Sequence, residues 1–280
     1  MTDQAATLRV VRDPKPSTPP RRAISVSGGK GGVGKSTIAV NLAIAYSQLG
    51  ARTLMVDTDL GMADLNLLLG VAPDKSVLDL LGGAPIEDVL VSAHGIDLLP
   101  ALNGSYLLST MGPTAHQRIL SMVGALSDRF DSLVVDIAAG IGQAQTTFGA
   151  ATSHAIVVVN PEPLSMADAY ACLKTLSMQE GVRHAYVLPN RVTSRAQADE
   201  LIARLGALVM RFLDLEITGL PAIPADPQVA EAAQYGIPLL VHAPGSPAAR
   251  AIRQLPRALS TLAPQADTWW RTSRAQGASR

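Results

Sequence analysis

The fold is decided by one glycine-rich stretch, Gly28-Gly29-Lys30-Gly31-Gly32-Val33-Gly34-Lys35-Ser36-Thr37. It follows an aliphatic run at Ala23–Ser27 and precedes a stretch of helical period. Glycines let the backbone curl so that successive N–H groups point inward, and a helix that begins there directs its positive end at bound phosphates. We expect Lys35 to reach phosphate oxygens and the Ser36 hydroxyl to ligate Mg²⁺. The alternative is a glycine-rich turn that holds a lysine by chance.

Outside this loop, short aliphatic runs alternate with longer stretches of helical period from residue 22 to residue 262. Strands that alternate with helices form parallel βαβ units. We expect strands at Ala23–Ser27, Thr53–Asp57, Ile96–Pro100, Ser132–Asp136, Ala155–Asn160 and Ala185–Pro189. The sequence therefore predicts an α/β fold: a doubly wound, mainly parallel sheet flanked by helices, forming a single domain over residues 22–262.

The composition restricts the class of protein. Hydrophobic residues make up 48% of the chain and aromatic residues only 4%, so the core must be aliphatic, as in layered α/β folds. Lys and Arg number 23, as do Asp and Glu, and this balance disfavours a DNA-coating protein. The single cysteine, Cys172, excludes a disulfide framework and fits a reducing compartment. With no signal-like apolar run at the N-terminus and no run of ~18 apolar residues, we expect a cytoplasmic protein.

Carboxylates follow two of the expected strands. Asp57 and Asp59 end the run that begins at Leu54, and Asp136 ends the run Leu133-Val134-Val135. The carboxyl ends of parallel strands form the rim at which α/β sheets bind ligands. An aspartate in such a position can also simply cap a helix.

The second lysine of the loop, Lys30, makes the motif resemble the deviant Walker A sequence of the MinD/ParA ATPases. The resemblance implies slow hydrolysis of Mg-ATP to ADP in a face-to-face homodimer. Lys30 would then cross to the partner's nucleotide and stabilise the transferring phosphoryl group, as Lys35 does within one copy. Asp59 would position the attacking water near Mg²⁺, and Asp136 would hold Mg²⁺ through water. Residues 137–142 would then act as a switch that senses the γ-phosphate. The alternative for Lys30 is that it is simply an exposed lysine of the loop.

The same resemblance implies which residues bind the nucleotide. The family places an asparagine against the adenine edge, which matches Asn190-Arg191 after the strand at 185–189. The segment Pro221–Asp226, which contains Pro224, resembles the family's second adenine-side loop. A strand-end asparagine is also a good turn former, so this reading has an alternative. The ATP/ADP-binding set is Gly29, Gly31, Gly32, Val33, Gly34, Lys35, Ser36, Thr37, Asn190, Arg191, Pro224 and Asp226, with Ser36, Asp59 and Asp136 as the Mg²⁺ set.

Three segments are similar to the FlhG (FleN, YlxH) branch of this family: residues 59–70, residues 136–141 and residues 3–9 near the N-terminus. That branch regulates flagellar number or placement, and its N-terminal helix stimulates GTP hydrolysis by FlhF, a signal-recognition-type GTPase. A flagellar transcription regulator or basal-body component is a further partner that the resemblance suggests. The matching partner-binding residues are Asp3, Gln4, Ala5, Leu8 and Arg9.

The two ends of the chain are expected to lie outside the ATPase domain. We expect a helix over residues 1–12, a proline-rich linker over 13–21 and a flexible tail over 263–280. The apolar residues at 248, 252, 255, 259 and 262 predict a last helix packed on the domain, which we expect Pro256 to kink or break. Peripheral membrane contact through Trp269-Trp270 is a hypothesis.

Two other functions share this fold. A ParA-type partition ATPase would bind DNA or a cargo adaptor, although neutral net charge disfavours DNA binding. An iron–sulfur carrier would need bridging cysteines, and the chain has one cysteine.

Overall fold

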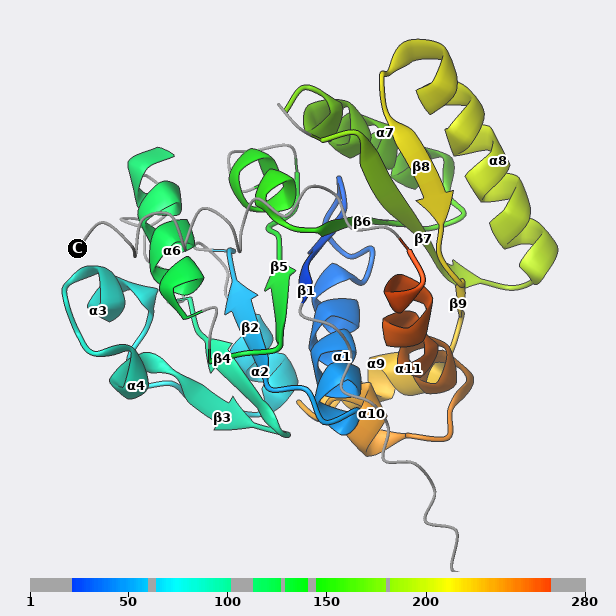
Figure 1. Cartoon of the computed structure of the whole chain (residues 1–280). Helices are drawn as coiled ribbons and strands as arrows, with labels where there is room; N and C mark the ends of the chain where they lie inside the picture. Colours follow the sequence, from blue (N-terminus) through cyan, green and yellow to red (C-terminus); the bar gives the residue numbers. More distant parts are fainter. Residues whose placement is uncertain are drawn as a thin grey trace, which may run out of the picture.

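A computed structural model of the chain describes residues 22–59, 64–101, 113–126, 129–140, 145–179 and 182–262 (Figure 1). The N-terminal helix with its partner-binding residues, the linker at 13–21 and the tail at 263–280 lie outside the described residues. These three segments, and the domain boundaries beside them, therefore stay predictions.

A mainly parallel sheet runs through the domain in the order β3-β4-β2-β5-β1-β6-β7-β8, and β9 pairs with β7. Every paired neighbour is parallel except β3 and β4, which are antiparallel. The predicted doubly wound α/β fold is confirmed. Its strands are β1 (Arg22–Ser27), β2 (Thr53–Asp57), β3 (Val91–Ala93), β4 (Ile96–Leu99), β5 (Ser132–Asp136), β6 (His154–Val159), β7 (His184–Val192), β8 (Glu216–Gly219) and β9 (Ile223–Pro224).

Helices cover both faces of the sheet because the central strands are apolar on both sides. Alternate residues of β1 illustrate this: Ile24 and Val26 pack with α1 and α11, whereas Ala23 faces the opposite layer. Figure 1 shows α7 and α8 together beside β6, β7 and β8. The helices are α1 (Lys35–Gln48), α2 (Leu65–Leu69), α3 (Val77–Leu81), α4 (Ile86–Val89), α6 (Pro113–Ala125), α7 (Pro163–Ser177), α8 (Arg195–Phe212), α9 (Pro227–Gln234), α10 (Leu239–His242) and α11 (Pro247–Ser260), with a π-helical turn η1 (Gln145–Gly149).

The expectation that Pro256 breaks the last helix is wrong, whereas a kink at this residue stays a prediction. Helix α11 continues through this residue to Ser260. Proline removes one backbone N–H donor from a helix, at a cost of about 3 kcal/mol. The neighbouring side chains of Ile252, Leu255 and Leu259 are buried in the cluster that contains α1, and this packing offsets the lost bond. The expectation of a last helix packed on the domain is confirmed.

Three strands were missed by sequence reasoning: β3, β8 and β9. Strand β3 is three residues long and β8 four, and both lie at the ends of the strand order. The side chains of β8 are exposed or half-buried, so the segment lacks the apolar run that identified the central strands. Edge strands of this kind give little periodic signal.

Candidate functional site

The glycine-rich loop connects the end of β1 to the start of α1, as predicted. Gly34 is the N-cap of α1 with φ +97°, and Gly32 has φ +80°, so both adopt a left-handed conformation that side chains disfavour. Gly29 has a different reason to be glycine, because a Cβ there would overlap the backbone carbonyl of Asp168 on α7. The loop thus lies between α1 and α7, and the N-terminus of α1 points at the loop.

The two lysines of the loop differ in their surroundings. Lys35, the first residue of α1, is only 8% exposed and lies close enough to Asp136 to favour its charged form. Lys30 is exposed at the tip of the loop, with Gly31 and Gly32 beside it. Lys35 is therefore built into its own site, whereas Lys30 faces outward.

Three carboxylates gather at the carboxyl ends of β2 and β5. Asp57 and Asp136 are register partners at the ends of these neighbouring strands, and both are 4% exposed. The backbone N–H of Asp59 donates to Asp57 Oδ1 at 2.9 Å, so Asp57 fixes the backbone that carries Asp59. Burial, and then the neighbouring Asp136, raises the pKa of Asp57 well above its ordinary value.

Asp136 lies close to the glycine-rich loop as well as beside Asp57. Burial raises its pKa to about 7, although a hydrogen bond from the Ser36 hydroxyl and the charge of Lys35 both act to lower it. Its Oδ1 atom is buried and has no hydrogen-bond partner among the described residues. A buried, unpaired carboxylate oxygen is costly unless a cation or donor meets it.

These residues fit Mg²⁺. The Ser36 hydroxyl and the Asp136 carboxylate meet directly, and Asp59 is near enough to raise the pKa of Asp136. Oxygen donors of this kind are the ligands that Mg²⁺ prefers. When bound, Mg²⁺ neutralises charge on the phosphates. The predicted assignment of Ser36, Asp59 and Asp136 to Mg²⁺ stays a prediction that the geometry supports.

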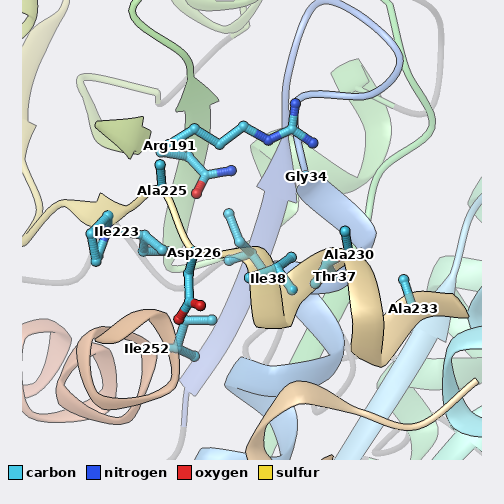
Figure 2. Close-up of a pocket in the computed structure, with 13 residues that line it drawn as sticks. Gly34, Thr37, Ile38, Arg191, Ile223, Ala225, Asp226, Ala230, Ala233 and Ile252 are labelled. Carbon is cyan, nitrogen blue, oxygen red and sulfur yellow. The ribbon is translucent and has the colours of Figure 1, made fainter. Parts of the chain in front are cut away.

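A cavity of about 430 Å³ opens beside the loop (Figure 2). This volume falls in the range of small-molecule sites. Asn190 lines it and donates from Nδ2 to the backbone carbonyl of Val33 at 2.8 Å, which ties the end of β7 to the loop. The cavity is lined by Gly34, Thr37, Ile38, Asn190, Arg191, Ile223, Pro224, Ala225, Asp226, Val229, Ala230, Ala233 and Ile252.

The four residues predicted on the adenine side therefore come together. Asn190, Arg191, Pro224 and Asp226 all line the cavity, although the last two are more than thirty positions from the first two in the sequence. Arg191 has φ 57°, and in Figure 2 its side chain extends from the end of β7 toward the loop. Contact of these side chains with a base stays a prediction.

The expected switch after β5 is only partly described, because residues 141–142 lie outside the described ranges. Ile137 is buried, and Gly140 has φ +105°. The Cys172 thiol on α7 donates to the carbonyl of Gly140 at 3.7 Å. Cys172 is itself buried, so the turn after Asp136 rests on α7, the helix that also contacts Gly29.

Sequence reasoning missed most of the cavity wall and one polar anchor behind it. The wall comes from small apolar residues such as Ala230 and Ala233 on α9, which carry no chemical signal. The anchor is Asn41 on α1, which is 1% exposed, donates to Thr37 O at 2.8 Å and accepts from Leu240 N at 2.8 Å. A lone asparagine inside the apolar run of α1 was the available signal.

Comparison with known proteins agrees with this geometry. Residues 20–260 match the ParA family model, described as "NUBPL iron-transfer P-loop NTPase". The chain belongs to the ParA family of P-loop NTPases. It is 38% identical over 217 residues to the antiactivator FleN of Pseudomonas aeruginosa, covering 77% of this chain and 78% of FleN. It is 32% identical over 185 residues to the flagellum site-determining protein YlxH of Helicobacter pylori, covering 65% of this chain and 62% of YlxH.

A solved structure supports the same assignment. The septum site-determining protein MinD from Pyrococcus horikoshii OT3, complexed with Mg-ADP, superimposes with a TM-score of 0.68. It is 27% identical and covers 85% of this chain and 95% of MinD. This ParA-family chain is an ATPase that uses ATP/ADP and Mg²⁺. The iron transfer named in the family description does not fit the chain, because its one cysteine, Cys172, is buried.

Among the residues that the structure describes, no helix is both long enough and apolar enough to cross a membrane.

Proposed function

We propose that this chain is an ATP-driven switch that regulates flagellar number or placement. Binding of Mg-ATP joins two copies face to face, and slow hydrolysis separates them. The observation that carries the flagellar assignment is the 38% identity to the antiactivator FleN over 77% of the chain. Similarity to a flagellum site-determining protein supports it.

The arrangement of the loop supports a dimer. Lys30 is exposed while Lys35 is buried in its own site, so Lys30 is free to reach a nucleotide held by a second copy. There it stabilises the negative charge that develops on the transferring phosphoryl group, as an arginine finger does. Asp59 orients the attacking water, and Asp57 holds Asp59 through its backbone N–H. ATP hydrolysis then requires that the dimer forms first, so hydrolysis is slow and sets how long the ATP-bound dimer lasts.

The N-terminal segment supplies the output. Residues 1–12, with Asp3, Gln4, Ala5, Leu8 and Arg9, bind an FlhF-like signal-recognition-type GTPase and stimulate its GTP hydrolysis. The proline-rich linker at 13–21 spans up to about 28 Å at ~3.1 Å per residue, so this segment reaches a partner away from the ATPase body. A flagellar transcription regulator or basal-body component is a second class of partner.

The direct experiment measures GTP hydrolysis by the FlhF-like protein of the same organism with a peptide of residues 1–22. We expect strong stimulation, and a Gln4→Ala peptide as the matched control should lose it. An active GTPase that does not respond to the peptide would contradict this role. A partition-type ATPase would then be the better reading, and salt-dependent DNA binding in the presence of ATP would support it.

Cytoplasmic location with peripheral membrane contact is the remaining part of the proposal. The segment 263–280 carries Trp269 and Trp270, and tryptophan favours the headgroup region of a bilayer. Co-sedimentation with liposomes, with and without ATP, compares the full chain with a chain that ends at Ala263. No ATP-dependent pelleting of the full chain would remove membrane contact from the proposal.

A further inference from the structure

The cavity of about 430 Å³ beside the loop, which we call the base cavity because we propose that it takes the nucleotide base, is assembled from elements that are distant in the sequence. Ala230 and Ala233 come from α9, Ile252 comes from α11, and Pro224 comes from β9. Helices α9 and α11 are separated by α10 and its connections, so something must fix their relative position. Asp226 stands between them, directly before α9.

Both carboxylate oxygens of Asp226 accept backbone N–H groups. Oδ1 accepts from Gln228 N at 3.0 Å, which caps the N-terminus of α9. Oδ2 accepts from Ala248 N at 2.9 Å, in the first turn of α11. Hydrogen bonds to a charged acceptor are about twice as strong as neutral ones. One side chain thus joins the starts of two helices.

The carboxylate is also directed away from the phosphate side of the cavity. Figure 2 shows it pointing toward α11, where Ile252 lies, and not toward Arg191 or Gly34. Burial alone would raise the pKa of Asp226, but hydrogen bonds from Ala248 N, the Ser246 side chain and Gln228 N outweigh burial and lower it. The group is therefore charged at neutral pH and fully engaged with the protein.

We propose that Asp226 is a positioning residue for the base cavity: it holds α9 against α11, and it does not itself contact the base. This revises the role expected from the sequence, which placed Asp226 among the nucleotide contacts. It rests on the proposal that the cavity takes the base. The two backbone hydrogen bonds of Asp226 go to α9 and α11 and not to β1 or α1, which carry the phosphate loop, so we expect the two halves of the nucleotide site to respond differently to their loss.

The experiment compares binding of Mg-ADP and Mg-pyrophosphate by the full chain, using displacement of a fluorescent ADP analogue. Pyrophosphate probes the loop alone, and ADP probes the loop together with the base cavity. Asp226→Asn replaces one acceptor oxygen by an N–H donor and so breaks one arm. We expect it to weaken ADP binding on the order of tenfold while pyrophosphate binding changes less than about twofold.

Two further variants make the result specific. Asp226→Ser retains an N-cap for Gln228 N but is too short to reach Ala248 N, so it should also lose ADP affinity selectively. Ser194→Ala removes an equivalent cap on α8, in which Gln197 N donates to Ser194 Oγ at 3.2 Å, and should leave both affinities unchanged. Circular dichroism and melting temperature establish that each variant is folded; if Asp226→Asn does not fold, Asp226→Ser decides.

Each outcome bears on one proposal. Unchanged ADP affinity in a folded Asp226 variant, or an equal loss for ADP and pyrophosphate, would overturn the positioning role. Wild-type protein that binds ADP no better than pyrophosphate would overturn the assignment of the cavity to the base instead.

Discussion

We predict that His154 makes the fold sensitive to acid. It is the first residue of β6 and is fully buried. Arg22 Nη1 lies 2.7 Å from His154 Nε2, and a guanidinium can only donate, so Nε2 must accept and the proton must sit on Nδ1. Nδ1 then donates to Ser153 Oγ at 3.0 Å. Burial, and then the charge of Arg22, lowers the pKa of His154 to about 4.

The sign of the effect follows from the direction of this shift. In the unfolded chain the pKa of histidine is about 6.5, so the unfolded state takes up a proton first as the pH falls. The contribution of His154 to the unfolding free energy is fully present above pH ~6.5 and is lost progressively between pH ~6.5 and ~4. The difference between the two pKa values corresponds to about 3 kcal/mol of unfolding free energy at most.

Urea unfolding followed by circular dichroism at pH 7.5, 6.0, 5.0 and 4.5 measures this. His154→Gln is the matched variant, because an amide oxygen can accept from Arg22 and does not titrate. Carboxylates such as Asp57 titrate in both proteins and cancel in the comparison. We expect the difference in unfolding free energy between wild type and variant to change by about 2–3 kcal/mol between pH 7.5 and pH 4.5, with the wild type losing more. A difference that does not vary with pH would refute the reasoning.

Three further predictions concern the nucleotide site. Asn41→Leu should lower the unfolding free energy by about 2–4 kcal/mol in urea titration, because it leaves Leu240 N–H buried without an acceptor; a loss below ~1 kcal/mol would contradict this. Gly29→Ala should weaken Mg-ADP binding on the order of tenfold in calorimetry, because its Cβ meets the Asp168 carbonyl and α7 must shift; unchanged affinity would show that the loop adapts freely. Chelation of Mg²⁺ with EDTA should reduce ATP hydrolysis to about a hundredth or less in a phosphate-release assay, and undiminished turnover would exclude the metal role of Ser36 and Asp136.

The parts of the fold that sequence predicted are those with a strong local cause. The central strands are continuous aliphatic runs buried on both faces, and the loop needs glycine at fixed positions, so both are visible in the residues themselves. The carboxylates Asp57 and Asp136 were found because strand ends in parallel sheets share one edge. Each of these features depends on a short segment and a general rule.

The parts that sequence did not predict depend on contacts between distant segments. The continuation of α11 through Pro256 is set by packing against α1, which no local propensity records. The hydrogen bond from Ala248 N to Asp226 joins residues that are 22 positions apart. Strand β8 has exposed side chains because it lies at the edge of the sheet, and so it lacks the pattern of a central strand.

The central claim is that ATP hydrolysis needs two copies of the chain, each of which places Lys30 at the nucleotide bound by the other. The most direct measurement is the rate of phosphate release per protomer across a wide range of protein concentration, at saturating Mg-ATP. The rate should rise with concentration and then level off, and Lys30→Ala should keep Mg-ATP binding while its rate stays low throughout. A rate per protomer that is independent of concentration and unaffected by Lys30→Ala would contradict the claim.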